Sequence, residues 1–236
     1  MNMLSEDVAH GVNWLIQASL ELDTWIHNVL KEEELLAWHI GELLYDLRGT
    51  EMRLAEMVSF REPAAAIDAL DEHCADVLDY LVPHWPLHVG PLRDRVVVRC
   101  KSITSIDGSK GFPELLGDLA SYRDSESVAL KGIDSLLAAS REFAMWMEMV
   151  GMGGAVFAQK LNDFLLDLKT LHRHLFRALP SRKLDEIGPA VLIFCDDVDT
   201  MLIRWRADMT CLRCWLNEHA PRAEVDLADG QEKNEE

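Results

Sequence analysis

The chain has 236 residues, and 49% of them are hydrophobic, so it is long enough to bury a substantial core. Its 41 acidic and 23 basic residues give a formal net charge of −18, which argues against binding to nucleic-acid backbones or anionic membranes. Five cysteines do not form a disulfide scaffold in a chain of this size. No signal-peptide pattern or membrane-length apolar run is present. We therefore expect a reduced cytoplasmic protein.

The first part of the chain has helical periodicity. Between residues 22 and 47 the apolar positions hold one register, which predicts a single long helix that starts near Ser5 and ends at Gly49. A further helix is predicted from Pro63 to about Val82.

Residues 83–112 have a different pattern. The segment "PHWPLHVGP" contains three prolines and is typical of a loop, and "RVVVRCKSIT" is β-branched and typical of a short strand or extended arm. The sequence therefore predicts one irregular insertion of a length that is often functional or involved in partner contacts.

The C-terminal half returns to helical spacing. Helices are predicted over 124–150, over 157–179 and from Pro189 at its first turn to just before Pro221, the last two with alternating steps of four and three residues. The stretch "GMGG", residues 151–154, predicts a short turn between two antiparallel helices. The acidic residues after 220 predict a disordered tail.

These patterns predict an all-α fold, an elongated bundle of about five to seven helices. We expect an N-terminal long-helix region (1–82), the irregular insertion (83–112), a C-terminal bundle (113–220) that packs with 1–82 as one domain, and the acidic tail (221–236). The segments "EPAAAIDALDEHCADVLDYL" and "GPAVLIFCDDVDTMLIRW" share a proline start and an acidic helix, but the sequence shows no convincing repeat.

One short motif raises the question of a metal. Cys211, Cys214 and His219 have the C-x2-C-x4-H order of a zinc knuckle, but the fourth ligand position falls on Glu224 in the polar tail. The motif also continues the register of the last helix. This favours cysteines that pack as small hydrophobic residues, so we expect no metal and no cofactor, with the three residues kept as an alternative zinc site.

Arg213 and His219 suggest an alternative catalytic function. Their R-x4-6-H spacing on a late helix resembles that of the HEPN-fold ribonucleases, which are all-α. The resemblance implies an active pair of Arg213 and His219 that cleaves RNA. The family usually has a polar residue after the arginine, whereas this chain has Cys214.

A third candidate function is nucleotide pyrophosphatase activity. The segment "EHCADVLDYL" looks like the E-x-x-D helix of the all-α MazG and dimeric dUTPase type, whose carboxylates bind magnesium around a triphosphate. His73 stands where an acid is needed before Asp76. In "KEEELLAWH", Glu33 and Glu34 are present, but Ala37 replaces the third acid.

The seven tryptophans and the acidity together favour a non-catalytic function. Trp38 lies beside an apolar seam, and His84, Trp85 and His88 lie in the predicted loop, where they are candidate surface anchors. We therefore expect an acidic interaction, adaptor or inhibitor subunit that binds a protein with a basic surface, for example one that handles nucleic acids. A homo-oligomer is a further expectation.

Overall fold

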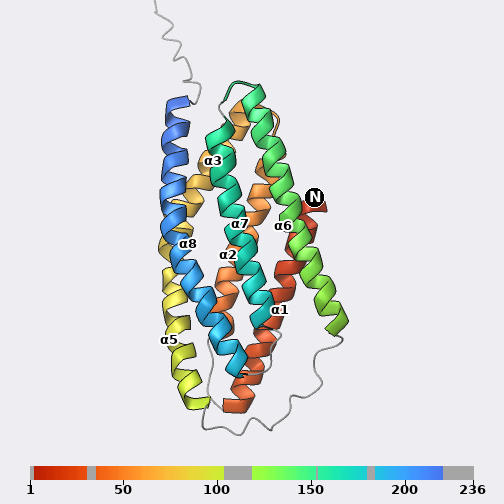
Figure 1. Cartoon of the computed structure of the whole chain (residues 1–236), viewed down its shortest axis with the longest axis vertical. Coiled ribbons are helices and arrows are strands. Elements are labelled where there is room, and N and C mark those ends of the chain that lie inside the picture. The colour runs from red at the N-terminus through yellow and green to blue at the C-terminus, as the bar shows by residue number, and fades with distance from the viewer. Residues whose placement is uncertain (1–2, 31–35, 104–118, 153, 180–183, 220–236) are drawn as a thin grey trace, which may run out of the picture.

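The computed structural model describes residues 3–30, 36–103, 119–152, 154–179 and 184–219. Every regular element in these residues is helical, and Figure 1 shows an elongated bundle, which confirms the predicted all-α fold class. The acidic segment 221–236 lies outside the described residues. The elements are α1 (Met3–Leu30), α2 (Leu36–Met57), α3 (Pro63–Ala75), the π-helix η1 (Asp76–Leu81), α4 (Val82–His84), α5 (Pro86–Ile103), α6 (Leu119–Met149), α7 (Gly154–Ala178) and α8 (Leu184–His219).

The helices form a closed ring around one core. α3, η1, α4 and α5 follow one another with only Trp85 between α4 and α5, so they form one long rod. With this rod counted once, the described residues make six rods. α1 packs against α2 and α6, α7 packs against α6 and α8, and α5 packs against α2 and α8. Buried residues from both 1–82 and 113–220 belong to the same hydrophobic cluster.

The single helix predicted for residues 22–47 is wrong. α1 ends at Leu30 and α2 begins at Leu36, and the two helices pack side by side, as Figure 1 shows. Both helices turn their apolar faces to the same core, so the apolar spacing is the same as in one continuous helix. Residues 31–35 lie outside the described residues.

The irregular insertion predicted for residues 83–112 is also wrong as far as Ile103, because α4 and α5 are helical. Pro86 is the first residue of α5, where its missing N–H group costs nothing. Pro91 lies inside the helix and removes one backbone hydrogen bond, but α5 buries one apolar face against its neighbours, and this packing overrides the β-propensity of the sequence. The buried residues of that face are Val89, Leu92 and Val96. Residues 104–118 lie outside the described residues.

The "GMGG" turn joins α6 and α7, which pack side by side. Gly151 has a φ of 79°, a backbone conformation that favours glycine. A Cβ atom on Gly154 would lie 2.2 Å from the carbonyl oxygen of Ala144 on α6, so glycine is required for the two helices to approach this closely.

The two halves of the chain repeat each other, which the sequence did not reveal. The buried positions of α2 recur in α7 with a spacing of 121 residues. Buried Ser19 and Ser140, also 121 residues apart, each donate a hydrogen bond to the carbonyl three residues earlier, at 2.8 and 2.9 Å. The repeated buried positions of α2 and α7 include Ile40 and Leu161, Leu43 and Phe164, Leu44 and Leu165, Leu47 and Leu168, and Leu54 and Leu175, and the pair Val58 and Leu179 follows directly after the two helices.

Polar contacts recur at the same spacing. Arg48 donates to Asn13 at 2.8 Å, and Lys169 pairs with Asp134 at the equivalent positions. Likewise, the Arg53–Asp76 pair at 2.7 Å corresponds to the His174–Asp197 pair at 3.4 Å. The chain is therefore a structural duplication in which α1 and α2 correspond to α6 and α7, and the rod from α3 to α5 corresponds to α8.

The π-helix η1 explains why the repeat is hard to find. Before it the spacing is 121 residues, as for Cys74 and Cys195, and after it the spacing is 120, as for Trp85 and Trp205. One extra residue in the first half therefore shifts the alignment, and η1 absorbs that residue without breaking the rod.

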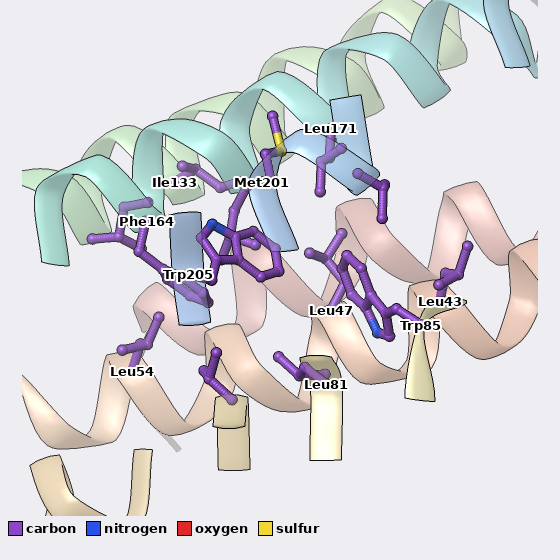
Figure 2. Packing of buried hydrophobic residues seen from close by; sticks show 14 of the residues in the cluster. Leu43, Leu47, Leu54, Leu81, Trp85, Ile133, Phe164, Leu171, Met201 and Trp205 are labelled. Atoms are coloured by element: carbon purple, nitrogen blue, oxygen red, sulfur yellow. The ribbon is translucent and has the colours of Figure 1, made fainter. Parts of the chain in front are cut away.

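Equivalent residues of the two halves also touch each other. His172 Nε2 lies 2.8 Å from Glu51 Oε1, and the ring centroids of Trp85 and Trp205 are 5.4 Å apart. Figure 2 shows both tryptophans in the shared core. Contacts between equivalent positions occur on a two-fold axis, so the halves are related by an approximate two-fold rotation.

Candidate functional site

The four predicted interaction residues converge at one place between α2 and the α4–α5 segment. The ring centroids of Trp38 and His88 are 5.2 Å apart, and those of His88 and His84 are 4.7 Å apart. Tyr80 from η1 extends this line, because its ring stacks on His84 at 4.8 Å. We call these four residues, Trp38, His88, His84 and Tyr80, the aromatic row.

Two members of the aromatic row, His84 and His88, also belong to a hydrogen-bonded chain that includes His39 and Asp46. His84 Nδ1 lies 3.3 Å from Asp46 Oδ2, His88 Nε2 lies 3.3 Å from His84 Nε2, and His39 Nδ1 lies 3.2 Å from His88 Nδ1. We call Asp46, His84, His88 and His39 the histidine chain.

One arrangement of protons satisfies every link of the histidine chain when all three imidazoles are neutral. His84 donates from Nδ1 to the carboxylate of Asp46, so its Nε2 accepts from His88 Nε2–H. His88 Nδ1 then accepts from His39 Nδ1–H, which leaves His39 Nε2 with a free lone pair. The chain therefore has a defined direction from His39 to Asp46.

Burial lowers the pKa of two of these histidines, His39 and His88. Burial lowers the pKa of His39 to about 4, with further lowering by His88 and Arg95. Burial and the neighbouring His84 also lower the pKa of His88, against the opposing effects of Glu42 and Asp46. Neutral imidazoles keep the nitrogen lone pairs on which the links of the chain depend.

Trp85 does not lie in an exposed loop as predicted. It is 1% exposed, its indole Nε1 donates to Asp46 Oδ2 at 3.0 Å, and its ring packs on Trp205 in the core. Figure 2 shows both rings among buried leucines. His88 is buried as well and His84 is half-buried, so Trp38 is the exposed member of the predicted set.

The surface around the aromatic row is apolar and acidic. Trp38 is 51% exposed and Tyr80 is 46% exposed. Tyr45, two turns after Trp38 on the same face of α2, is 57% exposed. Glu42 acts on both His88 and Tyr80, which places its carboxyl group beside the row.

The equivalent surface of the second half has permanent charges instead. Lys160 pairs with Asp208 at the positions of His39 and His88, and Arg204 pairs with Asp167 at the positions of His84 and Asp46. Trp205 donates to Asp167 at 2.8 Å, as Trp85 does to Asp46. Gln159 stands at the position of Trp38. The aromatic row is thus specific to the first half.

Arg213 and His219 are not brought together within the chain. Arg213 forms ion pairs with Asp71 at 3.4 Å and with Asp79 at 3.7 Å. The ring of His219 instead stacks on the ring of Trp215, with the ring centroids 4.8 Å apart. His219 Nδ1 is 2.9 Å from the carbonyl oxygen of Trp215. Each side chain is therefore engaged locally.

The expectation that Cys211 and Cys214 are packed as hydrophobic residues is wrong, because both are exposed. Their neighbours Leu212 and Leu216 face the core, as predicted. Burial raises the thiol pKa of Cys74 and of Cys195 to about 12. Within the described part of the chain, no three His, Cys, Asp or Glu side chains are arranged to hold a metal ion.

The carboxylates considered for a pyrophosphatase site are only partly described. Asp76 pairs with Arg53 at 2.7 Å, and Glu72 is exposed. Glu33 and Glu34 lie outside the described residues.

Sequence reasoning missed Asp46, His39 and Tyr80. The H-x3-H spacing of His84 and His88 would have placed both on one helix face had the segment been recognised as helical. No local signal connects Asp46 or His39 to these residues, because 38 to 49 residues separate the partners along the chain.

No protein-family model, curated protein or solved structure matches the chain. Among the described helices, none combines the length and the apolar character that crossing a membrane requires.

Proposed function

We propose that the protein is a non-catalytic interaction subunit that binds a basic protein surface through the aromatic row of the first half. The observation that carries this proposal is an exposed tryptophan whose ring packs on two buried histidines, His39 and His88, that are hydrogen-bonded to each other. Tryptophan and tyrosine side chains are frequent anchors of interfaces because they bury a large area with few rotatable bonds.

The charge of the chain supports a basic partner. The net charge of −18 attracts positively charged surfaces over a distance of about 10 Å at moderate ionic strength. Close to the row, the ring of Trp38 offers a face for a lysine or arginine side chain, and Glu42 supplies a carboxylate. A basic protein that handles nucleic acids has this chemistry.

The test compares equivalent positions of the two halves. The tagged protein is used to capture partners from its native lysate at low and high salt, and the captured proteins are identified. We expect Trp38→Ala and Glu42→Lys to abolish capture of a basic partner, because they remove the anchor and reverse the local charge.

Gln159→Ala and Asp163→Lys are the matched controls at the equivalent positions of the second half. They change the chain by the same kinds of substitution and should leave capture intact. Equal loss with both sets of variants would show that overall charge, and not this surface, determines binding. Capture that persists in Trp38→Ala and Glu42→Lys would contradict the proposal.

A further inference from the structure

The two nitrogens at the centre of the histidine chain have the spacing of metal ligands. His84 Nε2 and His88 Nε2 lie 3.3 Å apart. Two imidazole nitrogens that share a tetrahedral zinc ion at about 2.0–2.1 Å from each are separated by about 3.3 Å. The two histidines are four residues apart on successive helical turns, so both rings reach the same side of the rod.

The remaining ring nitrogens of both histidines are already oriented by partners. His84 Nδ1 faces the carboxylate of Asp46, the carboxylate–histidine contact that fixes the ring and the tautomer of zinc ligands. His88 Nδ1 faces His39 Nδ1 in the same way. Trp85 also donates to Asp46, which holds that carboxylate in place.

From this geometry we infer that His84 and His88 form a site for a divalent transition-metal ion such as Zn²⁺, bound through both Nε2 atoms. When the ion binds, the hydrogen bond between the two Nε2 atoms is lost, and each nitrogen binds the ion instead. Asp46 and His39 are positioning residues that do not touch the ion.

The protons balance when the ion binds. His84 keeps its proton on Nδ1, where it donates to Asp46. His88 moves its proton from Nε2 to Nδ1 and donates to His39 Nδ1, and His39 then carries its own proton on Nε2. All three imidazoles stay neutral and every link in the chain remains satisfied, so binding needs only a change of tautomer in His88 and His39.

The two imidazole ligands also indicate which metal ions the site prefers. Imidazole ligands suit Zn²⁺, Cu²⁺ and Ni²⁺ better than Mg²⁺ or Ca²⁺.

The site supplies two protein ligands and leaves the other positions of the ion open. Asp46 and His39 approach the opposite ring nitrogens of His84 and His88, so they cannot bind the same ion. This agrees with the finding that no three candidate ligand side chains in the described residues are arranged around one point. Water completes the coordination.

The experiment is a calorimetric titration of the full chain with Zn²⁺ at neutral pH. The background carries Cys211→Ser and Cys214→Ser, because exposed thiols are soft ligands that would compete for Zn²⁺ in the titration. We expect one strong ion per chain in this background. His84→Gln and His88→Gln should each weaken its affinity at least about tenfold, and Asp46→Asn should weaken it by about 10–100-fold.

His10→Gln, an exposed histidine of α1, is the control and should not change the affinity. A second variant combines His39→Lys, His84→Arg and His88→Asp, the residues that the second half carries at these positions, where Lys160 pairs with Asp208 and Arg204 pairs with Asp167. This variant should bind no strong ion. It keeps the test decisive if His88→Gln does not fold.

The position of the bound ion is tested by tryptophan fluorescence with Cu²⁺ as the probe. The His88 ring lies 5.2 Å from Trp38, so bound Cu²⁺ should quench an emission component that Trp38→Phe removes. The absence of strong Zn²⁺ binding, or affinity unchanged in both His84→Gln and His88→Gln, would overturn the inference. None of these measurements requires a protein partner, so the result is independent of the proposed function.

Discussion

The histidine chain of the first half and the ion pairs of the second half occupy equivalent positions on the same framework. His39, His84 and His88 correspond to Lys160, Arg204 and Asp208. The carboxylates beneath them, Asp46 and Asp167, accept from equivalent tryptophans. The two halves therefore share the tryptophan–aspartate hydrogen bond and differ in the outer side chains that contact the aspartate. A neutral chain leaves lone pairs for a ligand, whereas permanent ion pairs leave none, so we expect the site in one half only.

The largest effect is expected where the halves meet. Trp85→Ala and Trp205→Ala should each lower the free energy of unfolding by about 3–5 kcal/mol, because both rings are fully buried. The double variant should cost less than the two single losses together, since the rings contact each other. Urea denaturation measures all three, and a loss below about 1 kcal/mol for either single variant would contradict the shared core.

The second test concerns the buried pair on the two-fold axis. His172→Leu should cost roughly 3 kcal/mol, because it leaves the carboxyl group of Glu51 buried with neither oxygen hydrogen-bonded. Glu51→Leu with His172→Leu should recover most of that loss, since apolar side chains replace both groups. The cycle is measured by denaturation, and a double variant as unstable as the single one would show that the pair does not act as a unit.

Acid should destabilise the protein, and the first half should account for the effect. Burial lowers the pKa of His73 from 6.5 to about 3, and that of His39 to about 4. These groups stay neutral in the folded chain while the unfolded chain binds protons as the pH falls below 6.5. Stability is therefore fully present above pH 6.5 and is lost toward lower pH. For His73, we expect a loss of about 2–3 kcal/mol over two pH units, measured by denaturation at each pH.

The same comparison suggests a stabilising substitution. His73 is buried with both ring nitrogens unpartnered and packs against Phe164, and the equivalent residue of the second half is the buried Phe194. His73→Phe should therefore raise the free energy of unfolding by about 1 kcal/mol at neutral pH and reduce its dependence on acid. A variant with unchanged acid dependence would show that His73 does not cause it.

The smallest effect is expected at the surface. Arg48→Ala and Lys169→Ala remove equivalent contacts, to Asn13 and Asp134, and each should cost less than about 1 kcal/mol. Salt should reduce the cost of Lys169→Ala only, since Asn13 carries no charge. Denaturation at two salt concentrations measures this difference, and a larger loss for either variant would indicate that the contact also orders the helix pair.

Local pattern was enough to predict the helices of the second half. The alternating steps of four and three residues from Phe157 to Leu175 and from Val191 to Leu216 correspond to continuous buried faces of α7 and α8. The reversal between α1 and α2 was missed because both helices face one core with compatible spacing. The helical form of residues 86–103 was missed because proline and β-branched residues favour other structures, and only packing against α2 and α8 decides the outcome.

The role of the candidate site residues stays a prediction, and the sequence did not give their geometry. Trp38, His84, Trp85 and His88 were chosen for their side-chain chemistry, and they do meet. Asp46 and His39 supply the contacts that orient them, and these contacts cross between helices, where sequence spacing gives no information. The exposed pair Cys211 and Cys214 shows the reverse case, in which a correct helical register did not reveal which way the side chains point.

The π-helix η1 also bears on how the two halves are related. A chain whose halves repeat around a two-fold axis is most simply explained by duplication and fusion of a gene that encoded one half. The extra residue in η1 is present in the first half alone, so the two halves differ by one insertion or deletion within this rod. One half supplies only three of the six rods and leaves the faces around Glu51 and Trp85 uncovered, so we expect a single half, expressed by itself, to bury these faces by pairing with a second copy.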